Sequence, residues 1–168
     1  MTMSVQAKRG SAQFHCGTAT WCALSELSIS VAPDICAACK RWFTNDGDGL
    51  DAKGASALAE RLEAKIQDGT IGGMIREKID AANALPDEPC DLCKASGVRT
   101  DERAQSLGFD VRKIDEPGHP RLGQIGWCNG CGGRGHRRPF EAYYPLTDAS
   151  QVVELVSFLR TSGGFQIY

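Results

Sequence analysis

Three Cys-x-x-Cys pairs are the residues of this chain whose types and spacing could do chemistry. They are Cys36/Cys39, Cys90/Cys93 and Cys128/Cys131. The last two pairs lie in polar, glycine-rich stretches without helical periodicity, where a tight turn can aim both sulfurs at one point. Two such turns supply four sulfurs to one tetrahedral ion, each at about 2.3 Å, which is the geometry of structural zinc. We therefore expect Cys90, Cys93, Cys128 and Cys131 to bind one Zn²⁺.

Four thiolates would fill the coordination sphere of this ion. No position would be left for a water molecule, so we do not expect catalysis at the metal, and an enzyme is the less favoured class. Iron on the same four sulfurs is an alternative that the residue types leave open. The pair in PCDLC is not a deaminase half-site, because no histidine or cysteine upstream is followed two positions later by glutamate.

The segment CNGCGGRG, residues 128–135, resembles the Cys-x-x-Cys-x-Gly-x-Gly repeat of the DnaJ-type cysteine-rich zinc domain at every fixed position. The segment CDLCKASG, residues 90–97, is similar to it, but Ala95 stands where the repeat has its inner glycine. The resemblance implies that paired repeats build a zinc-binding β-hairpin unit that helps engage unfolded chains or partner thiols. The chain has two repeats rather than four, and its only His-Pro pair, at 119–120, lacks the aspartate of the J domain.

The totals describe an ordinary globular chain. It has 168 residues, a formal net charge of -2 and 42% hydrophobic residues, which suits one domain with a small appendage. No apolar signal segment or membrane span is visible, so we expect a cytoplasmic protein that does not contact membranes. In that compartment the eight cysteines are metal ligands, redox groups or packed apolar side chains rather than a disulfide framework.

Hydrophobic periodicity predicts an α+β fold. The clearest helix follows Asp51, a suitable N-cap, and ends at Asp68-Gly69. A second amphipathic helix follows and stops before Leu85-Pro86, and a last helix begins near Asp148 and ends at Gly163-Gly164. Shorter features are expected as a frayed tail over 1–12, two short helices within 13–43, a helix over 101–107, a strand around FEAYY and a terminal strand in FQIY.

The stretches on either side of the cysteine-rich segment carry a second resemblance. RWFTNDGDGLDAKGASALAERLE and the terminal FLRTSGGFQIY are similar to a widespread group of small uncharacterised bacterial proteins. This resemblance implies that residues 13–85 and 140–168 form one mixed core domain. Residues 86–139 would then be an inserted, glycine-rich zinc-knuckle lobe.

The N-terminal cysteines allow three interpretations. Cys36 and Cys39 could join Cys16 and Cys22 in a second metal site, which would raise the zinc content to two per chain. They could form a redox couple at the start of a helix, although the strand of a thioredoxin-like unit is missing before them. They could also simply pack, because the pair lies in a helical pattern and has no flanking glycines.

The surface beside the second repeat indicates a binding role. Residues 90–140 hold nine basic and six acidic residues, and Arg134, Arg137 and Arg138 directly follow the cysteines. We expect these arginines and Trp127 to face a protein partner, as parts of a non-catalytic interaction module. A nucleic-acid-binding accessory protein and a thiol-redox protein that uses Cys36/Cys39 are the alternatives. His119 and His136 are expected to be exposed loop residues.

Overall fold

The computed structural model describes residues 2–168, which divide into two compact units. The first unit comprises residues 2–80 and 144–168, and the second comprises residues 81–143. Helices and small antiparallel sheets together make the fold α+β, as the sequence predicts. Among the described residues, no helix has both the length and the apolar character needed to cross a membrane.

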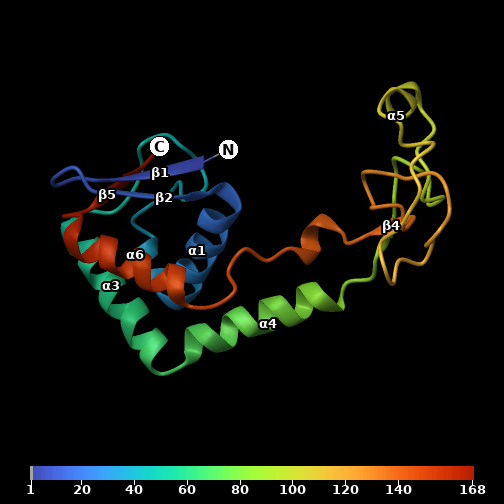
Figure 1. Cartoon of the computed structure of the whole chain (residues 1–168). Helices are drawn as coiled ribbons and strands as arrows, with labels where there is room; N and C mark the ends of the chain where they lie inside the picture. The colour runs from blue at the N-terminus through green and yellow to red at the C-terminus, as the bar shows by residue number, and fades with distance from the viewer. Residues whose placement is uncertain (1) are drawn as a thin grey trace. The chain divides into compact units, whose positions relative to one another are not determined.

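A three-stranded antiparallel sheet forms one side of the first unit (Figure 1). The central strand β1, Thr2–Ala7, lies between β2, Gln13–Gly17, and β5, Phe165–Ile167. Val5 pairs with Phe14 on one side and with Ile167 on the other, and all three side chains are buried. The terminal strand is therefore confirmed. The expectation of a frayed tail over 1–12 is wrong, because alternate residues of β1 pack into the core while its backbone pairs on both sides.

Helices of the first unit cover one face of this sheet (Figure 1). They are α1, Thr18–Val31; α2, Pro33–Cys36; α3, Ala52–Gln67; and α6, Ser150–Thr161. The N-cap of α3 is confirmed, because the Gly54 N–H donates to the Asp51 carboxylate at 2.7 Å. Two helices do occur within 13–43, but the segment begins with strand β2 and α1 is longer than a short helix.

The core of the first unit is built from aliphatic and aromatic side chains. It contains 26 buried residues contributed by the strands, the helices and the loops between them. At its centre Trp21 stacks on Trp42 with ring centroids 6.0 Å apart, and Phe165 lies 5.8 Å from Trp42. The indole N–H of Trp21 donates to the main-chain carbonyl of Trp42 at 2.7 Å, so burial leaves this polar group satisfied.

The second unit has little regular structure. The chain passes into it through α4, Thr70–Ala84, whose Ile71 and Ile75 belong to the core of the first unit. The second unit contains the short strands β3, Glu88–Pro89, and β4, His136–Arg137, the helix α5, Glu102–Ser106, and the 3-10 turn η1, Phe140–Ala142. The helix expected over 101–107 is thus confirmed.

The strand expected around FEAYY is wrong. The N–H of Ala142 donates to the carbonyl of Pro139, and the N–H of Tyr143 donates to the carbonyl of Phe140, each at 3.1 Å. These local bonds close a 3-10 turn in place of a sheet ladder. Pro139 lies at the N-cap of the turn with φ of −61°, a value that its ring favours and that suits the start of a helix.

Candidate metal centre

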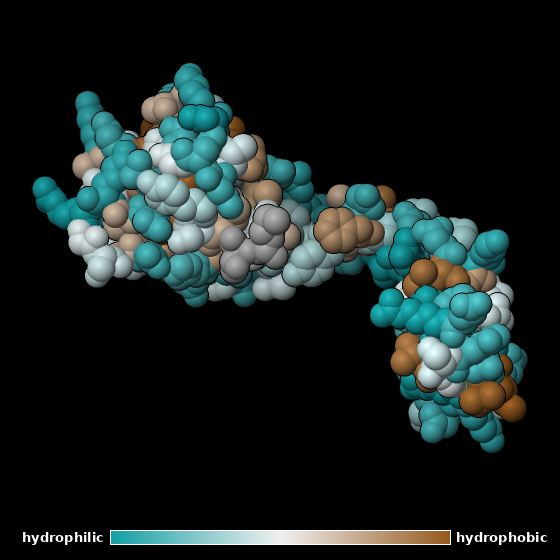
Figure 2. Space-filling model, turned by 90° about the horizontal axis from the view of Figure 1, so that it is seen from above, coloured by the Kyte–Doolittle hydropathy of each residue, from teal (hydrophilic) through white to brown (hydrophobic). Residues whose placement is uncertain are grey.

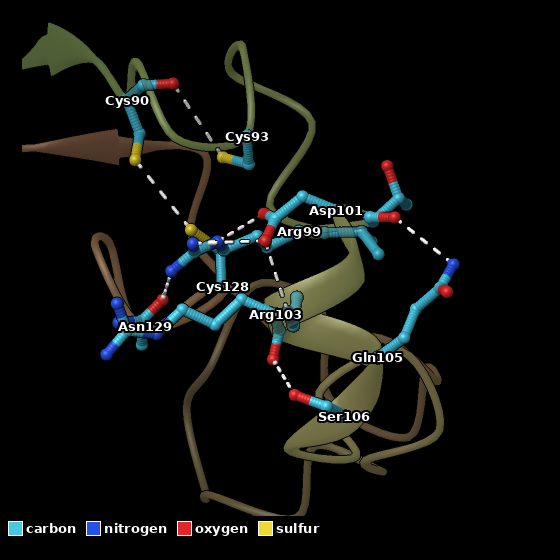
Figure 3. Close-up of polar contacts among 12 residues, drawn as sticks. Cys90, Cys93, Arg99, Asp101, Arg103, Gln105, Ser106, Cys128 and Asn129 are labelled. Carbon is cyan, nitrogen blue, oxygen red and sulfur yellow. Dashed lines mark hydrogen bonds and ion pairs between the residues drawn. The ribbon is translucent and has the colours of Figure 1, made fainter.

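The two glycine-rich Cys-x-x-Cys segments meet in the second unit. All four sulfurs, from Cys90, Cys93, Cys128 and Cys131, lie within 4.8 Å of one another, and all four residues are buried. The sulfurs of Cys90 and Cys128 are 3.8 Å apart (Figure 3), and those of Cys93 and Cys131 are 3.7 Å apart. A tetrahedral ion with bonds of about 2.3 Å requires sulfur–sulfur edges of about 3.8 Å. The cluster therefore fits one zinc ion.

Both segments follow the same backbone path after their second cysteine. The residue that follows it has a positive φ in each case, 47° at Lys94 and 59° at Gly132. So does the inner repeat position, with 65° at Ala95 and 80° at Gly133, and so does the outer glycine, with 76° at Gly97 and 85° at Gly135. Ala95 therefore adopts the left-handed conformation of a glycine, although it carries a Cβ atom.

The outer glycines hold the second cysteine of each pair and pack against the other pair. Gly97 N–H donates to the Cys93 sulfur at 3.3 Å, and Gly135 N–H donates to the Cys131 sulfur at 3.2 Å. A Cβ atom at Gly97 would lie 2.4 Å from the carbonyl oxygen of Gly133, and one at Gly135 would lie 2.3 Å from that of Ala95. Both positions thus require glycine for the close approach of the two backbones, in addition to their positive φ.

The environment of the sulfurs disfavours thiolates unless a cation is bound. Burial raises the pKa of Cys128 to about 12, and burial also raises the pKa of Cys93. At Cys90 burial acts in the same direction, but the N–H groups of Cys93 and Leu92 donate to the sulfur and hold its pKa below the ordinary value. Four sulfurs in so small a volume would repel one another if all were ionised, so their ionisation together requires a bound cation to balance the charge.

An ion pair beside the cluster links the two cysteine segments. The Arg99 guanidinium pairs with the carboxylate of Asp101 and donates to the side-chain carbonyl of Asn129 at 3.0 Å (Figure 3). Asp101 in turn accepts from the N–H of Ala104 and caps α5. The main chain joins here too, because the N–H of Arg99 donates to the carbonyl of Trp127 at 3.1 Å. Residues after the first pair are therefore fixed to the start of the second.

The three arginines expected to face a partner contact carboxylates of their own unit. Arg134 lies 3.3 Å from Glu116, Arg137 lies 3.0 Å from Asp91 and Arg138 lies 3.7 Å from Asp87. Arg138 also donates to the carbonyls of Ala82 and Leu85, at 3.0 and 2.9 Å, and so caps the end of α4. This contact ties the two ends of the unit together.

Trp127 is packed rather than fully exposed. Its ring meets Phe109 edge to face at 5.1 Å, and the guanidinium carbon of Arg112 lies 4.1 Å from the centroid of one of its rings. Half-buried between these two residues, the indole stabilises the surroundings of the second cysteine pair. A role for Trp127 in binding a partner stays a prediction.

The N-terminal cysteines lie in the first unit. Cys36 and Cys39 are buried in its core, and Cys16 and Cys22 are half-buried. Within residues 2–168, the four-cysteine cluster of the second unit is the one group of three or more side chains that could share a metal ion. Burial raises the pKa of Cys36 to about 12 and that of Cys39 to about 11, so both are neutral thiols near pH 7.

Two residues that matter for the cluster are missed by the sequence reasoning. His119 is only 4% exposed, so the expectation of an exposed loop histidine is wrong. Its ring contacts the main chain of the second cysteine segment, and Arg121 contacts main-chain carbonyls of both segments. The one signal in the sequence is the density of glycines, which brings backbones close together and leaves carbonyls that need donors.

The comparisons with known proteins return no match. No protein-family model matches the chain, and neither a curated protein nor a solved structure is significantly similar to it. The four-cysteine geometry is therefore the observation on which the function must be argued.

Proposed function

We propose that residues 81–143 form a lobe that is folded around one structural zinc ion and that binds a protein partner without catalysing a reaction. The supporting observation is that apolar side chains lie on the surface of this lobe while its interior is occupied by four sulfurs. Both repeats have a positive φ at the two positions that the Cys-x-x-Cys-x-Gly-x-Gly motif reserves for glycine, which supports the resemblance to the DnaJ-type zinc domain.

The interior of the lobe contains few apolar side chains. Its hydrophobic cluster consists of Cys90, Cys93, Cys128 and Cys131 alone. Ile114 is the one larger aliphatic side chain that is buried among the described residues of the lobe. Because so little apolar surface is buried, the metal must supply most of the free energy that holds the lobe together.

Several hydrophobic patches interrupt the largely hydrophilic surface of the lobe (Figure 2). Of the eleven exposed large apolar side chains in the described chain, eight belong to residues 81–143. They are Leu85, Leu92, Leu107, Val111, Leu122, Ile125, Phe140 and Tyr143. Exposed apolar side chains gathered on one unit favour contact with another protein, because their burial in an interface is favourable.

Charge favours a protein over a nucleic acid as the partner. Residues 81–143 contain nine basic and nine acidic residues, and an ion bound by four thiolates adds negative charge. Arg134, Arg137 and Arg138 are already paired with carboxylates. A surface without excess positive charge gains little from displacing the counterions of a nucleic acid.

The first experiment measures the metal content of the purified protein by elemental mass spectrometry. One zinc per chain is expected, and iron in its place would change the identity of the ion while leaving the ligands as proposed. Protein that carries no metal after anaerobic purification, and takes up none when zinc is added, would contradict the proposal.

The second experiment tests the partner class with a labelled, permanently unfolded polypeptide, reduced and carboxymethylated α-lactalbumin. Fluorescence anisotropy should show saturable binding to the zinc-loaded chain. The double variant Val111→Ser/Ile125→Ser removes side chains that are 70% and 65% exposed, and it should weaken binding at least about fivefold. Val153→Ser on α6, where the side chain is 50% exposed, is the matched control in the first unit.

Two results of this experiment would contradict the proposed partner. One is an absence of polypeptide binding. The other is binding of labelled single-stranded or duplex DNA that weakens steeply with salt, which would assign the lobe to the nucleic-acid alternative.

A further inference from the structure

The segment between the two cysteine repeats contacts both of them. We call residues 114–124 the inter-repeat loop. Its ends are joined, because the N–H of Ile114 donates to the carbonyl of Gln124 at 2.9 Å and the N–H of Gly123 donates to the carbonyl of Ile114 at 2.7 Å. The loop belongs to neither Cys-x-x-Cys-x-Gly-x-Gly segment, and nothing in the proposed function assigns it a role.

Arg121 reaches from this loop to both repeats. Its Nη1 lies 2.9 Å from the carbonyl oxygen of Gly97 in the first repeat and 3.2 Å from that of Gly133 in the second. The same guanidinium reaches the carbonyls of Gly126 and Ile125, both at 3.3 Å. A single nitrogen, Nη1, thus faces main-chain carbonyls of both repeats, while Nη2 adds the contact to Ile125.

His119 fixes the loop in this place. Its Nδ1 accepts the main-chain N–H of Arg121 at 3.0 Å, so the ring proton resides on Nε2. That Nε2–H donates to the carbonyl of Gly132 at 2.8 Å. The side chain of Gln124 accepts from the Nε of Arg121 at 2.9 Å and orients the guanidinium further. The arginine is therefore preorganised rather than free to rotate.

We propose that Arg121 is a positioning residue that holds the two repeats at the separation that a single tetrahedral ion requires, and that it thereby determines how tightly the four cysteines retain their metal. The inference rests on the proposed zinc site. Residues that orient the ligands of a metal from outside its coordination sphere commonly change its affinity by about 10- to 100-fold.

The test is a zinc titration of the metal-free full-length chain against a chromogenic chelator. Arg121→Met removes the donors but keeps much of the side-chain length, and we expect it to lower zinc affinity by about 10- to 100-fold. Arg121→Lys retains the charge but loses the Nε contact to Gln124 and the Nη2 contact to Ile125 that orient the side chain, so its affinity should be intermediate. Arg103→Met, on α5 in the same lobe, removes one exposed positive charge and should remain within about twofold of the wild type.

Cobalt(II) provides a second readout. The absorption bands of tetrahedral cobalt–thiolate coordination report whether all four sulfurs assemble. At saturating cobalt the wild type and Arg121→Lys should show the same spectrum, while the concentration needed for saturation rises in the variant. If Arg121→Met cannot assemble the site at any cobalt concentration, the comparison of Arg121→Lys with the wild type decides the question.

Three outcomes would overturn the inference. The first is that Arg121→Met binds zinc as tightly as the wild type. The second is that Arg121→Met and Arg103→Met lose the same amount of zinc affinity. The third applies if Arg121→Met does not assemble the site: Arg121→Lys then binds zinc as tightly as the wild type. All three leave the proposed zinc site intact. A wild type that binds neither zinc nor cobalt would instead remove the proposed site and this inference with it.

Discussion

The two units of this chain are held together in opposite ways. The first buries 26 residues in a hydrophobic cluster, with Trp21, Trp42 and Phe165 at its centre. The hydrophobic cluster of the second is four cysteines, and its remaining contacts are mainly between main-chain groups, glycines and charged side chains. Burial of apolar area stabilises the first unit, whereas in the second this role falls to the metal ion that we propose.

The largest expected effect comes from removing the metal. A strong chelator, or the substitution Cys128→Ser, should make the amides of residues 90–137 exchange rapidly, while α1, α3 and α6 stay protected. Structural zinc sites contribute about 10 to 16 kcal/mol to folding, so loss of the ion should unfold the lobe outright. Hydrogen exchange followed by mass spectrometry measures both regions in one experiment.

The matched control for this experiment is Cys36→Ser, which removes a thiol from the core of the first unit. It should leave one metal per chain and protected amides in the lobe. If chelation also unfolded the helices of the first unit, the metal would stabilise both units and not the second alone.

The converse change targets the hydrophobic core. Trp21→Ala removes a fully buried indole and its hydrogen bond to Trp42, and we expect it to lower the free energy of unfolding of the first unit by about 3 to 5 kcal/mol. Metal content should remain one per chain, because no residue of the cluster belongs to that core. Thermal unfolding with parallel metal analysis tests this, and loss of zinc in the folded variant would show that the units depend on one another.

A glycine substitution tests how closely the repeats must approach. In Gly97→Ala the new methyl group would lie 2.4 Å from the carbonyl oxygen of Gly133. The backbone of the new alanine would also have to adopt a φ of 76°. We expect a loss of at least about 2 kcal/mol from the lobe, since the left-handed conformation alone costs about 1 to 2 kcal/mol. Gly69→Ala is the control, because it has a φ of 80° but no atom of another residue near the added methyl group.

The zinc dissociation constant measures this loss. Gly97→Ala should raise it, whereas Gly69→Ala, which lies between α3 and α4 in the first unit, should leave it unchanged. Equal zinc affinities in the two variants would show that the close approach of Gly97 to Gly133 does not matter to the site.

A smaller gain is expected where the first repeat lacks its inner glycine. Ala95 has a φ of 65°, and the equivalent Gly133 has a φ of 80°. Ala95→Gly should stabilise the lobe by about 0.5 to 1 kcal/mol, because relief of backbone strain exceeds the entropy that glycine loses on folding. A lower zinc dissociation constant would show the gain. Destabilisation would mean that the methyl group makes a packing contact worth more than the strain.

The last prediction concerns the chemistry of the N-terminal pair, outside the metal centre. Because the pKa of Cys36 is raised to about 12 and that of Cys39 to about 11, the reactive thiolate is scarcer at pH 7.5 than in a free cysteine. Iodoacetamide should modify Cys36 at least about 100-fold more slowly than it modifies free cysteine. Peptide mass spectrometry measures this, with urea-unfolded protein as control. Rapid modification of the native chain would restore the thiol-redox alternative.

The elements that hydrophobic periodicity governs were predictable from the sequence. The helix after Asp51 and the terminal strand are found where the pattern places them. Strand β1 was not predictable, because TMSVQA has one short polar and apolar alternation and becomes a strand only through pairing on both sides. The final helix is present near Asp148, whose carboxylate accepts from the N–H of Ser150 in the turn before the helix.

Only part of the candidate site was predictable from the sequence. Cysteine spacing is a local signal, and the four sulfurs do lie together. The contacts of His119 and Arg121 depend on backbone carbonyls brought close by folding, so no spacing rule could indicate them. The arginines after the second repeat are visible in the sequence as a row of positive charges. The sequence does not reveal, however, which carboxylates lie beside them in the folded chain.

The contact between Arg138 and the end of α4 brings the two ends of the lobe together. Arg138 donates to the carbonyls of Ala82 and Leu85, and Glu88 lies opposite Arg137 in the pairing of β3 with β4. The chain therefore enters and leaves the lobe at adjacent points. A module whose ends meet can be grafted into the loop of an unrelated scaffold without forcing that loop open. The lobe could in this sense be transplanted as one unit, and its own two ends could be joined directly.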